Sequence, residues 1–461
     1  MTRQGKGVRL IIMAVQIIDL QLGLEDRCFL SHRNLSKETG AAADRRHPTR
    51  RNARLLPRVP PHRDPRERNG ASTRSRKGGA AMTATQHVSR VVTNPLYRGH
   101  RMKLGVMAFN CSHGSTITTA EGAWELHWGD TKKIAKMADS AGLDVLLPVG
   151  RWRGYGGPTN FNNSTYESFT WASALAAMTD QIAVFATCHV PLVHPIMAAK
   201  MATTVDHVSG GRFCLNVVCG WFKDEFEMFG AEWREHDVRY EYATEWVELM
   251  RRVWSEEKEF DYSGRFFQSK RAWSQPKPIQ KPFPPVMNAG GSEAGQHFAA
   301  TVADMNFVIL RNQDFDGGKT QIDKLKSMAR AVGREVQVWI HVYVVVRDTE
   351  EEARRYLNYY VREKGDYDAV NNLLTIFGMQ SKTLDPKVLD EFRFHFIAGH
   401  GGYPLVGTPA QVVDQLEMLT RMGVDGCLIS WVNYVDELKQ WIDEVNPLLE
   451  QAGLRQRYTP D

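Results

Sequence analysis

The stretch Ser209–Tyr240, SGGRFCLNVVCGWFKDEFEMFGAEWREHDVRY, decides how the chain is organised. It opens with a glycine turn and continues as the apolar run Phe213–Val218, which predicts a strand of a buried parallel sheet. One polar residue, Asn216, interrupts that run. An irregular aromatic loop follows, and Arg239 then opens an amphipathic helix. A strand end, a loop and a helix start are therefore adjacent, which is where α/β enzymes place their active sites.

The alternation of strand and helix repeats along the chain from residue 103 onwards. We expect strands at 104–110, 143–150, 181–190, 213–218, 285–291, 305–310, 336–346 and 423–431, and helices at 130–141, 167–178, within 194–211, and at 240–254, 317–332, 349–363 and 434–452. Short links between alternating elements indicate parallel strands and right-handed crossovers. The pattern predicts an α/β fold, a (β/α)8 TIM barrel with insertions. A doubly wound open sheet is the alternative. The sequence argues against it, because no GxGxxG motif follows the first strand.

Two segments interrupt this rhythm. Residues 261–268 look like half of a hairpin, and 365–407 mix helical and loop character. We expect the second segment to be an insertion in the barrel domain, 102–461, and to act as a mobile lid. Its glycines Gly399, Gly401 and Gly402 are candidate hinges.

The amino-terminal segment differs in composition from the rest of the chain. Residues 1–81 hold 18 Lys and Arg against 7 Asp and Glu; subtracting these from 58 and 53 leaves 40 against 46, a net charge of −6. Arginine and proline are frequent from residue 32 to 81 and apolar periodicity is weak, so we expect residues 1–101 to form a disordered extension. Either this extension is an arm that binds nucleic acid or a membrane, or it is not translated and the protein starts at Met82 or Met102. Because no nucleic-acid module follows, we expect no nucleic-acid partner.

Further classes of protein are excluded by composition and cysteine spacing. No apolar run reaches the roughly 18 residues that span a bilayer, so we expect a cytoplasmic protein without a membrane partner. The six cysteines are scattered without a CxxC pair or metal-ligand spacing. The sequence therefore indicates reduced thiols, no disulfide framework and no metal site.

The residues that follow the expected strands are candidates for a binding site. They are Asn110, Gly150, Arg151, Thr187, His189, the run 216–221, Gly290, Gly291, Ser292 and Trp431. Ser292 and the two preceding glycine amides stand at a helix amino terminus, which binds anions. Arg151, Arg153 and Arg239 add groups that can contact phosphate. Together these residues suggest a flat phosphorylated cofactor.

Other interpretations of single residues remain open. His189 and His194 could be a metal pair, or a core histidine and a helix-entry histidine. Cys219 could be a nucleophile or a buried thiol, and Trp221 a core residue or a ligand wall. The acidic residues between Glu225 and Asp237 could include an acid/base group or could form a solvated face.

A family resemblance rests on three motifs: the opening stretch, WRGYGG at 152–157 and NAGGSEAG at 288–295. Together they resemble the bacterial luciferase-like flavin-dependent monooxygenases, nearest the pyrimidine monooxygenase and dimethyl sulfone monooxygenase branch. The resemblance implies a TIM barrel that uses reduced FMN (FMNH2) with O2 as co-substrate. It also implies a separate NAD(P)H:flavin reductase, so that NAD(P)H acts only through that partner.

The resemblance also implies site residues. The expected FMN contacts are Gly150, Arg151, Asn216, Glu225, Arg239, Tyr240 and Ser292, and the residues at the oxygen-reactive edge of the flavin are Thr187, Asn216 and Trp221. The pyrimidine enzyme has a larger apolar residue and a lysine in place of Gly150 and Arg151, and a hydroxyl residue in place of Cys219. The loop 189–194 also differs and would face the substrate.

The expected function is oxidation and cleavage of a small N-heterocyclic compound, pyrimidine-like or riboflavin-like, in a catabolic pathway. The alternatives are an organosulfur monooxygenase, a deazaflavin-dependent dehydrogenase and a non-enzymatic flavin-binding protein. We expect a small-molecule substrate and a homo-oligomer, dimer or tetramer.

Overall fold

Eight parallel strands close into a barrel, as the alternating pattern predicts. They are β1 (Lys103–Met107), β2 (Val145–Leu147), β3 (Ala183–His189), β4 (Phe213–Val218), β7 (Val286–Asn288), β8 (Met305–Val308), β9 (Gln337–Val346) and β11 (Gly426–Ser430). The sheet runs in the order β11-β1-β2-β3-β4-β7-β8, and β9 pairs with both β8 and β11, which completes the circle. The computed structural model describes residues 94–310, 313–379 and 385–459. The expectation of a disordered extension over residues 1–101 lies outside these ranges for residues 1–93.

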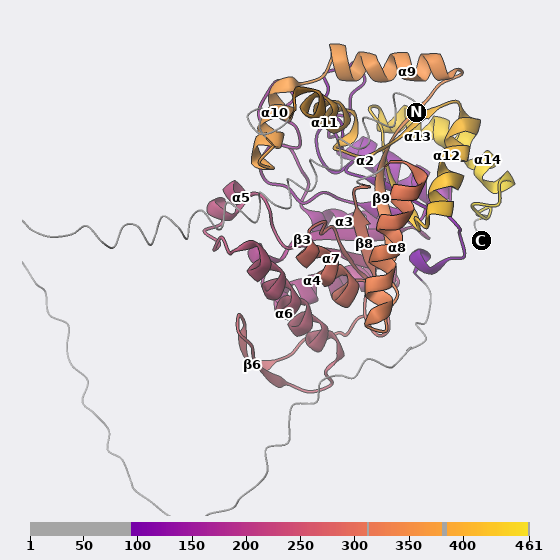
Figure 1. Cartoon of the computed structure of the whole chain (residues 1–461). Helices are drawn as coiled ribbons and strands as arrows, with labels where there is room; N and C mark the ends of the chain where they lie inside the picture. Colours follow the sequence, from indigo (N-terminus) through magenta and orange to yellow (C-terminus); the bar gives the residue numbers. More distant parts are fainter. Residues whose placement is uncertain (1–93, 311–312, 380–384, 460–461) are drawn as a thin grey trace, which may run out of the picture. The chain divides into compact units, whose positions relative to one another are not determined.

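Helices between consecutive strands surround the barrel (Figure 1). They are α2 (Trp128–Ser140), α3 (Ser168–Ala176), α4 (Pro195–Val208), α6 (His236–Ser255), α7 (Glu293–Val302), α8 (Phe315–Ala331), α12 (Pro409–Met422), α13 (Tyr434–Gln440) and α14 (Asn446–Gln451). Local sequence explains their ends: α12 starts with a capping box between Thr408 and Gln411 and stops at Gly423, whose φ is 102°. Within the described ranges no helix is long and apolar enough to cross a membrane.

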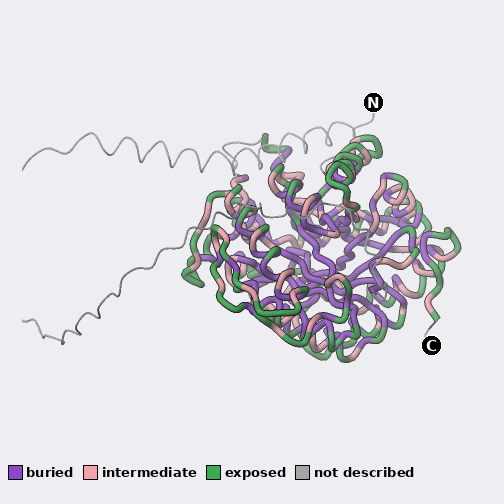
Figure 2. The backbone as a smooth tube through the Cα atoms, turned by 90° about the horizontal axis from the view of Figure 1, so that it is seen from below, coloured by how far each residue is buried: buried purple, intermediate pink, exposed green. Residues whose placement is uncertain are grey.

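The buried residues form two layers, one inside the barrel and one between the strands and helices. Figure 2 shows buried residues concentrated in the middle of the domain and exposed residues around its rim. Alternate strand residues point inward, and the inner layer includes Leu147, Phe185, Met287 and Trp339. The opposite faces of the same strands pack against the helices. The interior is therefore filled with side chains, and a ligand site has to lie at an end of the barrel.

The amino-terminal end of the barrel is closed by a short segment that the sequence did not indicate. Pro95–Tyr97 form a 3-10 turn, η1, and Leu96 is fully buried among the inward side chains. Asn94 donates hydrogen bonds to the Phe213 carbonyl (3.4 Å) and to Gln280 Oε1 (3.1 Å). The folded domain thus starts before residue 102, because residues 94–101 already pack against the strands.

The helix predicted at 349–363 is present as α9 (Glu350–Asn358) and a π-helical turn η3 (Tyr359–Glu363). The segment 365–407 is more regular than expected, because it contains α10 (Tyr367–Ile376) and α11 (Pro386–Gly399). The elements from α9 to residue 407, called the insertion below, gather at one end of the barrel (Figure 1). The insertion ends in a ninth strand, β10 (Tyr403–Gly407), which pairs with residues 342–346 of β9. β10 corrects the expectation of mixed helical and loop character alone between 365 and 407. β10 forms because β9 is ten residues long and its last residues extend beyond the barrel partners, which leaves an edge to pair.

Hydrogen bonds tie the insertion to the loops after β1 and β2. Asp366 accepts from the Thr159 amide and hydroxyl, both at 2.7 Å, and Asn372 donates to the Tyr155 carbonyl at 2.8 Å. Thr118 donates to the Tyr360 carbonyl at 2.7 Å. The insertion and these loops therefore form one packed body at the carboxyl-terminal end of the strands. Lid movement stays a prediction.

Candidate functional site at the barrel mouth

The carboxyl-terminal end of the strands, called the mouth below, brings Thr187 and Asn216 together. The two residues are partners in the register of β3 and β4, and Asn216 Nδ2 donates to Thr187 Oγ1 at 3.1 Å. Thr187 in turn donates to the Pro148 carbonyl at 2.6 Å. Asn216 Oδ1 is buried and has no hydrogen-bond partner among the described residues. Buried acceptors are rarely left unpaired, so this oxygen indicates a ligand that carries an N–H donor.

A buried ion pair joins the loop after β2 to the short helix α5 (Lys223–Met228). Arg151 Nη1 lies 3.2 Å from Glu225 Oε1, and the two side chains are 4% and 3% exposed. The same carboxylate accepts the Trp152 amide at 2.9 Å, and the Arg151 guanidinium lies 4.8 Å from the ring centre of Trp221. A Cβ at Gly150, the residue before Arg151, would lie 3.0 Å from the His189 ring, so a side chain there would require that ring to shift.

The amino terminus of α7 supplies the features of a phosphate site. Ser292 caps this helix by accepting the Gly295 amide at 3.1 Å. A Cβ at Gly295 would lie 2.7 Å from the Tyr240 hydroxyl, so that hydroxyl lies beside the helix end. Amides at a helix end and a tyrosine hydroxyl are donors that a phosphate group accepts. Arg239, one residue earlier on α6, donates to the Gly220 carbonyl at 3.1 Å and lies near the aromatic loop.

Seven aromatic rings form a closed circuit at the mouth, which we call the aromatic enclosure. In order around the circuit they are Trp221, Phe222, Tyr155, Phe161, His400, Phe396 and Phe377. The centroids of neighbouring rings lie 5.6 to 5.8 Å apart, and the circuit closes between Phe377 and Trp221 at 4.8 Å. The rings come from the loop after β2, the loop after β4 and the insertion. The position of Trp221 is compatible with both a ligand wall and core packing, so its role stays a prediction. The sequence did not single out Phe377, Phe396 or His400.

Three histidines at the mouth, His189, His341 and His400, are called the mouth histidines below. His341 points into the barrel from β9 and lies 2.8 Å from Ser430 Oγ. Burial is the main cause that lowers the pKa of each histidine, and a neighbouring group lowers it further. The pKa is about 3 for His189, about 3 for His341 and about 4 for His400. For His189 and His400 that neighbouring group is Arg151. All three are therefore neutral at pH 7.

Two of the alternative interpretations are not supported by the structure. His194 accepts the Ile196 amide and caps α4, so it is a helix-entry residue, and the described residues contain no cluster of His, Cys, Asp or Glu that could hold a metal. Burial raises the pKa of Cys219 to about 12, which keeps the thiol protonated and a poor nucleophile. Asn110 exchanges hydrogen bonds with Val149 and has a structural role.

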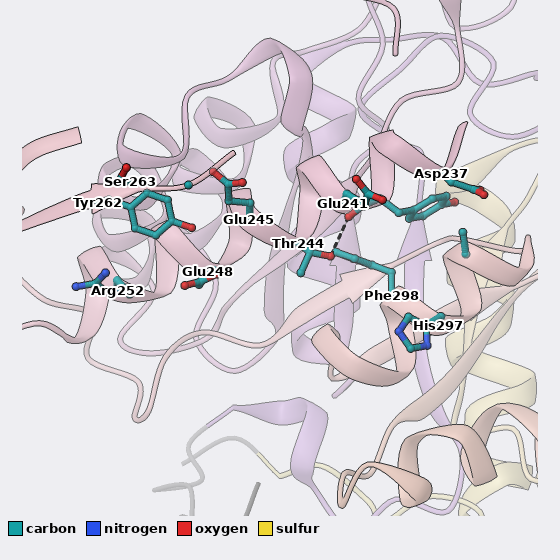
Figure 3. Close-up of a pocket in the computed structure, with 13 residues that line it drawn as sticks. Asp237, Glu241, Thr244, Glu245, Glu248, Arg252, Tyr262, Ser263, His297 and Phe298 are labelled. Atoms are coloured by element: carbon teal, nitrogen blue, oxygen red, sulfur yellow. Dashed lines mark hydrogen bonds between the residues drawn. The ribbon is translucent and has the colours of Figure 1, made fainter. Parts of the chain in front are cut away.

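An acidic groove lies on the outer side of the barrel, and its lining includes Tyr240 and Ala294, beside the amino terminus of α7 (Figure 3). It measures about 760 Å³ and is lined by Glu241, Glu245 and Glu248 of α6, by the hairpin β5 (Phe260–Ser263) and β6 (Gln268–Ala272), and by α7. Glu245 accepts three successive amides of the hairpin turn, 265 to 267, so its carboxylate serves the fold. Glu227, Glu232 and Asp237 are exposed, as a solvated acidic face would be, whereas Glu225 is buried.

The mouth has features that fit FMN. It combines an unpaired buried acceptor, stacking surfaces and a helix amino terminus beside a tyrosine hydroxyl. Of the residues implied by the resemblance, six lie at the mouth: Gly150, Arg151, Thr187, Asn216, Trp221 and Glu225. The Tyr240 hydroxyl lies beside Gly295 of α7, the helix that Ser292 caps. Which of them contact FMN stays a prediction.

Comparison with known proteins assigns the family. The model of the luciferase-like monooxygenase family matches residues 102–426. The chain is 30% identical over 360 residues to the FMNH2-dependent dimethylsulfone monooxygenase of Pseudomonas putida, covering 76% of this chain and 95% of that protein. It is 30% identical over 367 residues to the pyrimidine monooxygenase RutA of a Bradyrhizobium species, covering 77% and 99%.

Solved structures share the fold at lower identity. A riboflavin lyase, crystallised with modified FMN and riboflavin, has a TM-score of 0.69 at 20% identity and covers 78% of this chain and 94% of its own. DmoA from Hyphomicrobium sulfonivorans has a TM-score of 0.69 at 22% identity, covering 78% and 90%. The closed parallel barrel, the mouth and the extent of the family match together show that the chain belongs to the luciferase-like monooxygenase family.

Proposed function

We propose that the chain is the oxygenase component of a two-component system, which uses reduced FMN and O2 to oxidise and cleave a small N-heterocyclic compound. The observation that carries the proposal is the pair Thr187 and Asn216, whose free Oδ1 atom is buried at the mouth. An asparagine held by a neighbouring threonine presents this acceptor in one orientation. A reduced flavin ring has N–H groups that suit it.

The remaining residues have roles that follow from their chemistry. The Gly150 backbone and the Arg151–Glu225 pair would border the flavin ring, and Ser292, the α7 amides, Tyr240 and Arg239 would hold its phosphate. Bound FMN supplies the electrons and the oxygen-transfer chemistry. The protein binds and orients both reactants and excludes water through the aromatic enclosure.

An N-heterocycle is favoured because the aromatic enclosure suits a flat ring. The relative RutA is a pyrimidine monooxygenase, and a riboflavin lyase shares the fold. Oxidation of an organosulfur compound is the second candidate, because the Pseudomonas putida relative is a dimethylsulfone monooxygenase at the same identity. The proposal includes an NAD(P)H:flavin reductase as partner, a homo-oligomeric state and a cytoplasmic location.

The test is oxygen-dependent substrate loss with reduced FMN supplied by an unrelated flavin reductase and NADH. Uracil, riboflavin and dimethyl sulfone are offered separately, and 18O2 labels the product. We expect one 18O atom in the product of a heterocycle; loss of dimethyl sulfone alone would select the organosulfur function. Turnover without O2 on reduced deazaflavin would identify a dehydrogenase. FMN binding without loss of any compound would identify a flavin-binding protein.

A further inference from the structure

Two unpaired atoms at the mouth are closed off from solvent. Asn216 Oδ1 and His189 Nδ1 are both buried and have no hydrogen-bond partner among the described residues. Their side chains are neighbours, because His189 follows Thr187 by two residues on the same face of β3, and Thr187 is bonded to Asn216. A ligand can reach either atom only if a group that covers this corner of the mouth moves. The covering group that is held most weakly should move first.

Hydrogen bonds hold two of the neighbouring covers in place. The insertion is bonded to the loop after β2 through Asp366 and Asn372, at 2.7 and 2.8 Å. Helix α5 is bonded to the same loop through Glu225, which accepts from Arg151 and from the Trp152 amide. Movement of either element would leave buried polar groups without partners, which is unfavourable. Neither element is therefore suited to frequent opening.

The side chain of Trp152 is held differently. Its backbone amide is anchored to Glu225, but the indole Nε1 makes no hydrogen bond to a residue in the described part of the chain. The ring contacts of the indole are with His189 and Phe229, at centroid distances of 5.4 and 5.1 Å. Trp152 is 37% exposed, whereas the neighbouring His189 is 4% exposed. The indole thus shields His189 from solvent and can turn away without breaking a hydrogen bond.

The two ring contacts set how often the indole is turned away. Loss of both contacts disfavours the open rotamer by about ten- to a hundredfold. Exposed side chains change rotamer on the order of nanoseconds, which is much faster than a ligand binds or leaves. The open rotamer is therefore rare but frequently visited. Ligand entry is slowed in proportion to the fraction of molecules in which this rotamer is present.

We propose that the Trp152 indole is a side-chain gate, which admits the flavin to the ends of β3 and β4 when it turns away and closes again once the flavin is bound. This inference rests on the proposed function, because an oxygenase supplied with reduced FMN by a reductase has to take up and release flavin in each cycle. A gate that is closed in both the free and the bound state changes the association and dissociation rates by the same factor. The affinity is then unchanged, whereas removal of a residue of the binding wall lowers it.

The first experiment measures the binding of oxidised FMN to the full chain by stopped-flow fluorescence. In Trp152→Ala both rates should rise about tenfold or more, and Kd should stay within about twofold of the wild type. Phe229→Ala removes one of the two ring contacts, so both rates should rise about threefold. Trp152→Phe keeps a ring and should stay close to the wild type. Trp273→Ala is the matched control and should change neither rate, because Trp273 is 38% exposed but lies after β6, beside Lys277.

The second experiment measures the accessibility of His189 in the FMN-free protein. Diethyl pyrocarbonate modifies accessible neutral imidazoles, and His189 is neutral at pH 7 because burial lowers its pKa to about 3. Peptide mass spectrometry should show His189 modified about tenfold faster in Trp152→Ala and at the wild-type rate in Trp273→Ala. Circular dichroism confirms that the variants are folded.

Either of two results in Trp152→Ala overturns the gate even where the wild type binds FMN. One is an unchanged rate of His189 modification. The other is an unchanged association rate of FMN, with or without a change in Kd. A wild type that binds no FMN overturns the proposed function instead, and the modification of His189 still measures whether the indole shields it.

Discussion

The buried Arg151–Glu225 pair allows a quantitative test of how the mouth is held together. The change is Glu225→Gln, which removes the carboxylate charge but keeps an oxygen to accept the Trp152 amide at 2.9 Å. Arg151 then stays buried, with its side chain 4% exposed, and loses its anionic partner at 3.2 Å. The contact with the Trp221 ring at 4.8 Å persists and offsets only part of the loss.

The expected cost follows from burial. Removing one partner of a buried ion pair destabilises a protein by about 3 to 5 kcal/mol, because the remaining charge is uncompensated. For a domain of this size, a loss of 1 kcal/mol in the free energy of unfolding lowers Tm by about 1.3 °C, because the shift equals that loss divided by the entropy of unfolding. The Tm should therefore fall by about 4 to 7 °C. The double variant Arg151→Met/Glu225→Gln removes both charges and should recover most of this loss.

The assay is thermal and urea-induced unfolding of the FMN-free protein at pH 7.5. Asp390→Asn is the control, because Asp390 pairs with Arg362 at 2.7 Å but both side chains are more than 40% exposed. That substitution should cost less than about 1 kcal/mol. If Glu225→Gln lowers Tm no more than Asp390→Asn does, or if the double variant is the least stable of the three, the charge-compensation argument is wrong.

Three further predictions concern the mouth. Asn216→Ala should abolish flavin-dependent turnover while the circular dichroism spectrum stays native, since the change removes the free acceptor; an unchanged rate in the oxygen-consumption assay contradicts the assigned role. Gly295→Ala should weaken FMN binding by at least tenfold in a fluorescence titration, because its Cβ would approach the Tyr240 hydroxyl to 2.7 Å. Equal affinity in this variant would show that the amino terminus of α7 does not bind FMN. The mouth histidines have pKa values of about 3 to 4 when folded and about 6.5 when unfolded, so the unfolded chain binds more protons below pH 6.5. The free energy of unfolding should therefore be retained above pH 6.5 and should fall as the pH drops toward 4. In urea titrations at pH 5 we expect a loss of about 2 kcal/mol per histidine, and a smaller loss in His341→Gln.

Local sequence patterns predicted most of the barrel. The apolar run 213–218 became β4 with the same limits, and 336–346 became β9 with one residue fewer. Such runs suffice because buried parallel strands are apolar on both faces. β10 was missed because its short sequence contains Pro404 and pairs only with the overhang of β9, a tertiary circumstance.

The site was less accessible to sequence reasoning than the fold. His341 gave a usable signal: it interrupts the apolar run that follows Gln337 in β9, and it shares the inward face with Trp339 and Tyr343. His400 gave none, because the ring of Phe161 that contacts it lies far earlier in the chain. Glu225 could not be separated from its exposed acidic neighbours, since its burial depends on Arg151 from another loop.

The turn at Pro95–Tyr97 also matters for engineering. Leu96 fills the amino-terminal end of the barrel, and Gln337 donates to its carbonyl at 2.9 Å. A recombinant form trimmed to Met102 would lack Leu96, and the apolar inward side chains that Leu96 packs against would be exposed at that end of the barrel. Because burial of apolar surface stabilises the fold, we expect such a shortened form to be less stable even though every mouth residue is intact. The first residue of a recombinant form therefore has to lie before Asn94.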